Sequence, residues 1–143
     1  MRALPRVGLT LASLLLAVGA AHAAAPTEHS DLPDRRARES VARDLLYCGS
    51  LYTGLSLKVP AGKRDAVANL GASLTASAAT VLPDDVEFLK RELESVSNRI
   101  AAEIVDASGE KLGQLAQSAD CKSYLQEDGI NAAIRKRNAA FNP

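Results

Sequence analysis

Apolar residues recur every three or four positions along most of the chain, the spacing that places them on one face of an α-helix. The first stripe predicts a helix over residues 33–58, which Asp31 or Asp34 caps and which ends before Pro60. Its members are Val41, Leu45, Cys48, Tyr52, Leu55 and Val59. Because Cys48 lies inside this stripe, we expect its side chain in the core.

A second stripe predicts a helix over residues 63–80, which ends ahead of Pro83. Its members are Val67, Leu70, Leu74, Ala78 and Val81, and most residues between them are Ala, Ser or Gly. Small side chains let two helices approach closely. We expect this close packing within the domain rather than against a partner.

The third stripe follows a helix start at Pro83, where acidic residues oppose the positive end of the helix dipole. It comprises Leu89, Leu93, Val96, Ile100 and Ile104, and it continues nearly in phase through Leu112, Leu115 and Ala119. This continuity predicts one long helix over 84–118, bent near Gly109. The main alternative is a break at Gly109 into two helices. Arg99 and Glu103, four residues apart, are expected to pair on the exposed face.

The remaining segment holds a short turn at 121–126 and a last helix that begins after Gly129 and runs into Arg135–Arg137. No stretch alternates with the period of two that a strand requires. We therefore predict a single all-α domain over 33–143, a small antiparallel bundle of about four helices. The first and third helices are expected to run antiparallel, with the second packed against both.

The N-terminal residues have the layout of a secretory signal peptide over 1–23. Arg2 and Arg6 precede the apolar run at 9–18, and small residues lead to a cleavage site between Ala23 and Ala24. The apolar run is shorter than the ~20 residues of a spanning helix, so no stable membrane insertion is expected after cleavage. Residues 24–32 read as a disordered leader. The predicted location is the periplasm or the outside of the cell, in a bacterial host suggested by the arginine- and alanine-rich composition.

The two cysteines, Cys48 and Cys121, lie 73 positions apart in the predicted mature chain. An even cysteine count in a small exported protein predicts a disulfide. An intermolecular link and a reactive thiol are the alternatives, although the chain has no C-x-x-C spacing.

Composition argues against several functional classes. After cleavage, 15 basic and 17 acidic residues remain, and this net charge of −2 gives no reason to expect a nucleic-acid partner. The mature chain retains one histidine, His29, which lies in the predicted leader rather than in the helical domain. Histidine-dependent catalysis therefore lacks its base, and no metal-ligand spacing is present. The acidic residues at 84–87 are explained by a helix start. We expect no enzyme activity, no metal and no cofactor.

Tyr47 and Tyr52 flank the first cysteine and are the candidate partner-binding residues, although packing around the disulfide also explains them. We therefore expect an exported helical protein that acts as a non-enzymatic interaction module, such as an inhibitor, an immunity protein or an adaptor, with a protein partner in the cell envelope. Two alternatives stay open. One is a periplasmic stress chaperone or holdase, since small acid-stress chaperones have a similar helical architecture with one disulfide but share no motif with this chain. The other is a carrier of a small apolar ligand.

Overall fold

The computed structural model describes residues 32–142, and these residues form five α-helices and no strand. The predicted signal peptide and nearly all of the predicted leader, with His29, lie outside the described residues. The helices are α1 (Leu32–Ser56), α2 (Ala61–Val81), α3 (Val86–Asp106), α4 (Gly109–Ser118) and α5 (Gly129–Phe141), with a 3-10 turn η1 (Ser123–Leu125) before α5. The all-α prediction is confirmed. The expected count of about four helices is corrected to five.

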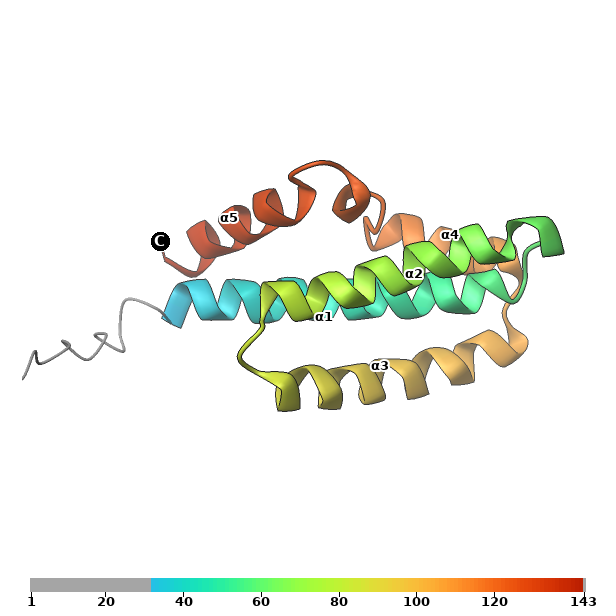
Figure 1. Cartoon of the computed structure of the whole chain (residues 1–143), viewed down its shortest axis with the longest axis horizontal. Coiled ribbons are helices and arrows are strands. Elements are labelled where there is room, and N and C mark those ends of the chain that lie inside the picture. Colours follow the sequence, from blue (N-terminus) through green and yellow to red (C-terminus); the bar gives the residue numbers. More distant parts are fainter. Residues whose placement is uncertain (1–31, 143) are drawn as a thin grey trace, which may run out of the picture.

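α1 is the central helix, and each of the other four helices packs on it (Figure 1). Its buried apolar residues lie on several sides rather than on one, and they include Ala37, Val41, Ala42, Leu45, Leu46, Cys48 and Leu51. Short links at both ends of α2 each reverse the chain. As a result α2 is antiparallel to α1, whereas α3 runs in the same direction as α1 (Figure 1). The expected antiparallel arrangement of the first and third helices is therefore wrong.

α1 and α2 approach each other at a pair of glycines. A Cβ atom on Gly49 would lie 2.3 Å from Oγ1 of Thr75 and 2.9 Å from the carbonyl oxygen of Gly71. A Cβ atom on Gly71 would in turn lie 2.7 Å from Oγ1 of Thr53 and 2.8 Å from the carbonyl oxygen of Gly49. The two backbones touch here because neither residue carries a side chain, which accounts for the small residues in this part of the sequence.

The predicted long helix over 84–118 is wrong, and the alternative break is the one observed. Ala107 has extended backbone angles (φ −86°, ψ 138°), and its side chain is buried. The next residue, Ser108, caps α4 because its hydroxyl oxygen accepts a hydrogen bond from the backbone N–H of Lys111 at 3.2 Å. The extended Ala107 thus ends α3, and the Ser108 cap starts α4.

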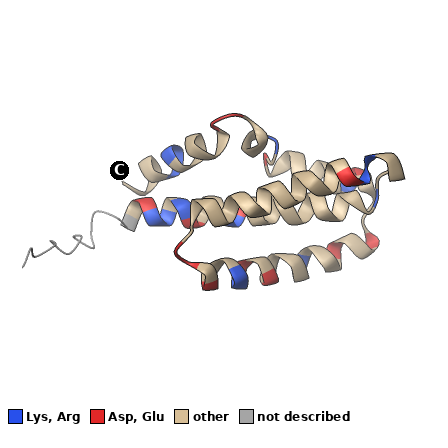
Figure 2. Cartoon of the chain, viewed as in Figure 1, with Lys and Arg blue, Asp and Glu red and all other residues tan. Residues whose placement is uncertain are grey.

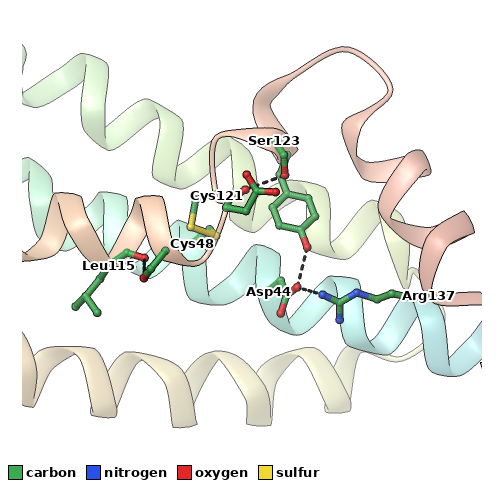
Figure 3. Close-up of a disulfide and its surroundings, with 9 residues drawn as sticks. Asp44, Cys48, Leu115, Cys121, Ser123 and Arg137 are labelled. Carbon is green, nitrogen blue, oxygen red and sulfur yellow. Dashed lines mark hydrogen bonds and ion pairs between the residues drawn. A yellow bond between two sulfur atoms is a disulfide. The ribbon is translucent and has the colours of Figure 1, made fainter. Parts of the chain in front are cut away.

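The disulfide between Cys48 and Cys121 joins α1 to the turn after α4, with an S–S distance of 1.99 Å (Figure 3). Both cysteines are fully buried, as the stripe predicted for Cys48. A second link lies beside it, where Arg137 of α5 pairs with Asp44 of α1. Within residues 32–142, no helix combines the length and the hydropathy that a membrane span needs.

Candidate functional site

α3 rests mainly on α1 and barely touches α2, so both of its long flanks are open. One flank, between α3 and the α1–α4 side, forms a hollow that we call the polar crevice. The other flank, on the α2 side of α3, forms two adjoining hollows that we call the apolar groove; α2 and α3 line the first, and mainly α1 and α3 line the second. These surfaces are the candidates for binding.

The polar crevice has a volume of about 530 Å³. It is lined by Arg43, Asp44, Tyr47, Cys48, Glu92, Ser95, Val96, Arg99, Glu103 and Ala119. Arg43 is held at one end by two contacts. Its Nε lies 3.2 Å from Oε1 of Glu92, and its guanidinium lies 5.0 Å from the ring centroid of Phe88. The charge of Arg43 is thus already neutralised by the protein.

Arg99 lies over the ring of Tyr47, with its guanidinium 5.1 Å from the ring centroid. It forms no ion pair with any carboxylate of residues 32–142, and the pair with Glu103 expected from the sequence is not observed. Both Arg99 and Glu103 are exposed, whereas Tyr47 is half-buried and packs against the core. A cation–π contact orders the arginine and leaves its N–H donors available at the mouth of the crevice.

Tyr52, the second candidate from the sequence, does not line this crevice. It is also half-buried against the core. Five positions along a helix correspond to a rotation of about 140°, so Tyr47 and Tyr52 lie on different sides of α1. A partner-binding role for either tyrosine stays a prediction.

The apolar groove consists of two hollows of about 320 and 310 Å³, and Thr75 and Leu93 line both. The first is completed by Leu46, Ala78, Ala79, Val86, Leu89 and Lys90, and the second by Ser50, Thr53, Gly54, Leu57, Ser97, Ile100, Ala101 and Ile104. Lys90 is the sole charged residue among them. Leu57 and Val86 are 66% and 65% exposed, unusually high values for branched apolar side chains.

The α2 wall of this groove continues into an uncharged surface. α2 carries no charged residue after Asp65, and Figure 2 shows the helix without charge colours over most of its length. Its exposed residues there include Ala72, Ala76 and Ala79. Its other exposed residues include Asn69, Ser73 and Thr80, so this face is polar in places but carries no charge.

A third hollow, of about 480 Å³, lies beside α5, and three of its lining residues, Asp44, Tyr124 and Arg137, belong to one polar network. Oη of Tyr124 donates a hydrogen bond of 2.7 Å to Oδ2 of Asp44, and Arg137 donates to the same carboxylate and to Ser40. Burial, followed by the hydrogen bond to Asp44, raises the pKa of Tyr124. This network attaches α5 to α1. Sequence reasoning missed it, because the helical pattern places Arg137 at the end of the last helix and does not show that this helix lies beside Asp44.

Other chemistry is sparse within the described residues. No group of three or more His, Cys, Asp or Glu side chains in 32–142 is arranged to hold a metal ion. Oδ1 of Asp85, from the acidic run at 84–87, accepts a hydrogen bond of 3.1 Å from the N–H of Phe88, and Oδ2 pairs with Arg35 at 2.6 Å. These contacts fit the helix-start role expected from the sequence.

Comparison with known proteins gave no match to a family model, to a curated protein or to a solved structure.

Proposed function

We propose that the protein is an exported, non-enzymatic interaction module that binds a protein partner of the cell envelope through the polar crevice. The observation that carries this proposal is the Arg99–Tyr47 stack, which presents an ordered and unpaired guanidinium above a half-buried tyrosine. Tyrosine and arginine are the side chains that dominate binding energy in many protein interfaces. The signal-peptide layout of residues 1–23 supports export.

The charges at the mouth of the crevice indicate what the partner offers. Arg99 and Glu103 lie one helical turn apart, and neither forms an ion pair within 32–142. A partner segment with a carboxylate opposite Arg99 and a cationic group opposite Glu103 satisfies both. An apolar or aromatic side chain beside them reaches Tyr47. Such a segment gains specificity from two charges of opposite sign in fixed order.

The test is affinity capture with the mature chain, residues 24–143, from an envelope extract of the host, followed by quantitative mass spectrometry. Three baits are compared: the wild type, Arg99→Glu and Arg91→Glu. Arg91 is exposed on α3 and does not line the crevice, so its reversal matches the charge change without touching the site. We expect one partner to be retained by the wild type and by R91E and to be lost with R99E, since a reversed charge repels the partner's carboxylate.

Equal capture by R99E would show that the crevice is not the binding surface. Failure of the wild type to capture any protein above the level of an unrelated exported bait would overturn the interaction-module proposal itself. Circular dichroism of each bait before use excludes unfolding as the reason for a loss.

A further inference from the structure

We infer that the apolar groove between α2 and α3 is covered by the same groove of a second copy, so that the protein is a two-fold symmetric homodimer. This inference concerns the opposite flank of α3 from the polar crevice and goes beyond the proposed function. Its basis is an incomplete apolar surface whose shape, charge and size fit a second copy.

The groove leaves part of the α3 stripe without a neighbour. Leu89, Leu93 and Ile104 are only half-buried although they pack against the core, and Val86 is 65% exposed. α2 stands too far from α3 to cover them, because both helices rest on α1 and barely touch each other. Apolar surface of this extent is favourably removed from water, so an occupant lowers the free energy of the molecule.

The shape of the groove is self-complementary. Exposed apolar side chains project at its two ends, Leu57 at one and Val86 at the other. The stretch between them carries small residues on both walls, including Ala78 and Ala79 on α2 and Ala101 on α3. When two copies meet about a two-fold axis, the Leu57 end of each faces the Val86 end of the other, as an isologous interface requires. The antiparallel pair α2–α3 of each copy then supplies half of a four-helix bundle.

The charge distribution permits this pairing. The predicted mature chain has 15 basic and 17 acidic residues, a net charge of only −2, so two copies meet with little net repulsion. Lys90 is the one charged residue that lines the groove, and the adjoining face of α2 has none after Asp65. Depletion of charge at the centre of a surface patch is the compositional mark of a buried interface.

The size of the groove is close to that of the smaller specific interfaces. Along α3 the groove extends from Val86 to Ile104, which is about 27 Å of helix. Two helices side by side present a width of roughly 20 Å, which gives a projected footprint of about 500 Å² before side-chain relief is added. The smaller specific interfaces bury roughly 600 Å² per partner. The groove therefore comes close to the lower limit for a specific interface, as expected for a dimer of modest affinity.

The experiment measures the mass of the mature chain in solution by analytical ultracentrifugation over a series of concentrations. The variants are Ala101→Glu, which places a carboxylate in the groove, and the matched control Ala102→Glu. Both alanines are exposed neighbours on α3, and Ala102 does not line the groove. We expect the wild type and A102E to sediment as dimers. A101E should dissociate with a Kd raised about tenfold or more, because each copy buries an unpaired charge.

A second groove variant, Val86→Glu, tests the other end of the surface at a residue that is already exposed, so it replaces A101E if that variant fails to fold. Arg99→Glu, from the polar crevice, should remain dimeric, which separates this outcome from that of the capture experiment. A wild-type protein that is monomeric at its highest soluble concentration would overturn the inference. If such a monomer also retained bound lipid, the groove would instead be the site of a lipid carrier. A dimer unaffected by both A101E and V86E would also overturn it.

Discussion

The two flanks of α3 differ in whether contacts within the protein already hold their side chains. On the polar side, Arg43 is paired with Glu92 and Arg99 is stacked on Tyr47, so the side chains are ordered before any partner arrives. On the apolar side, the same helix presents Leu89, Leu93 and Val86 to a hollow that α2 does not close. One helix thus separates a surface suited to a specific charged ligand from a surface suited to apolar association.

The difference follows from the position of α3 on a single supporting helix. A helix packed between two neighbours buries a wide apolar face, and its remaining positions are solvated. Because α3 rests mainly on α1, its apolar stripe is covered along the centre, and the side chains on its two flanks stay partly exposed.

The largest effect is expected from removal of the disulfide. In the loop-entropy model, a link that closes a loop of this length stabilises the fold by roughly 4 kcal/mol, so the Cys48→Ser/Cys121→Ser double variant should lose about that much free energy of unfolding. Cys48 also lines the polar crevice, whereas neither cysteine lines the apolar groove. We expect partner capture to weaken more than dimerisation. Urea denaturation and the two binding assays measure these quantities, and an unchanged midpoint would contradict the stabilising role.

A smaller effect is expected at the contact between α1 and α2. In Gly49→Ala the new methyl group meets the backbone of Gly71, and overpacking of this kind costs about 1 to 3 kcal/mol. The displaced α2 carries Thr75, which lines the apolar groove, so dimerisation should suffer and partner capture should not.

Gly113→Ala is the matched control for that variant, because a Cβ there has no heavy atom within 4 Å and the residue lies inside α4. It should stabilise the protein by up to about 1 kcal/mol. Thermal unfolding compares the melting temperatures of Gly49→Ala and Gly113→Ala. Equal melting temperatures would mean that the close approach of α1 and α2 contributes nothing.

The smallest effect is expected from salt. Raising the ionic strength from about 0.05 M to about 0.5 M shortens the screening length severalfold, so binding through Arg99 should weaken by a few-fold. Association through the apolar groove should be unchanged or slightly tighter, since apolar burial does not depend on charge. Titrations of the partner and of the dimer at the two salt concentrations make the comparison. A parallel response of both equilibria would remove the distinction between the flanks.

Several parts of this arrangement were predictable from local patterns. The helical periodicity located α1, α2 and the start of α3 within a few residues, and the presence of only two cysteines left one possible intramolecular disulfide. The break before α4 was not predicted as the main outcome, because the apolar stripe stays in phase across it. Ser108 followed by Glu110 was the available signal, since a serine cap and an acid in the first turn mark a helix start.

The burial of α1 on several sides and the two flanks of α3 could not be read from the sequence. Ala37 and Ala42 carry no strong apolar signal, yet both are fully buried because other helices surround α1. Tyr47 was identified as a candidate, but its contact with Arg99 depends on the packing of α3 against α1. A periodic stripe shows which face of a helix is apolar and does not show how many neighbours cover it.

The position of the second cysteine has a consequence for biosynthesis. α1 is made before the other described helices, whereas its covalent partner, Cys121, and its ion-pair partner, Arg137, are made only after α4. α2 can cover part of α1 soon after it is made, but the side of α1 that contacts Cys121 and Arg137 stays uncovered until these residues have been made. A chain that stops before residue 121 cannot form this bond and lacks the covalent link between α1 and the segment after α4.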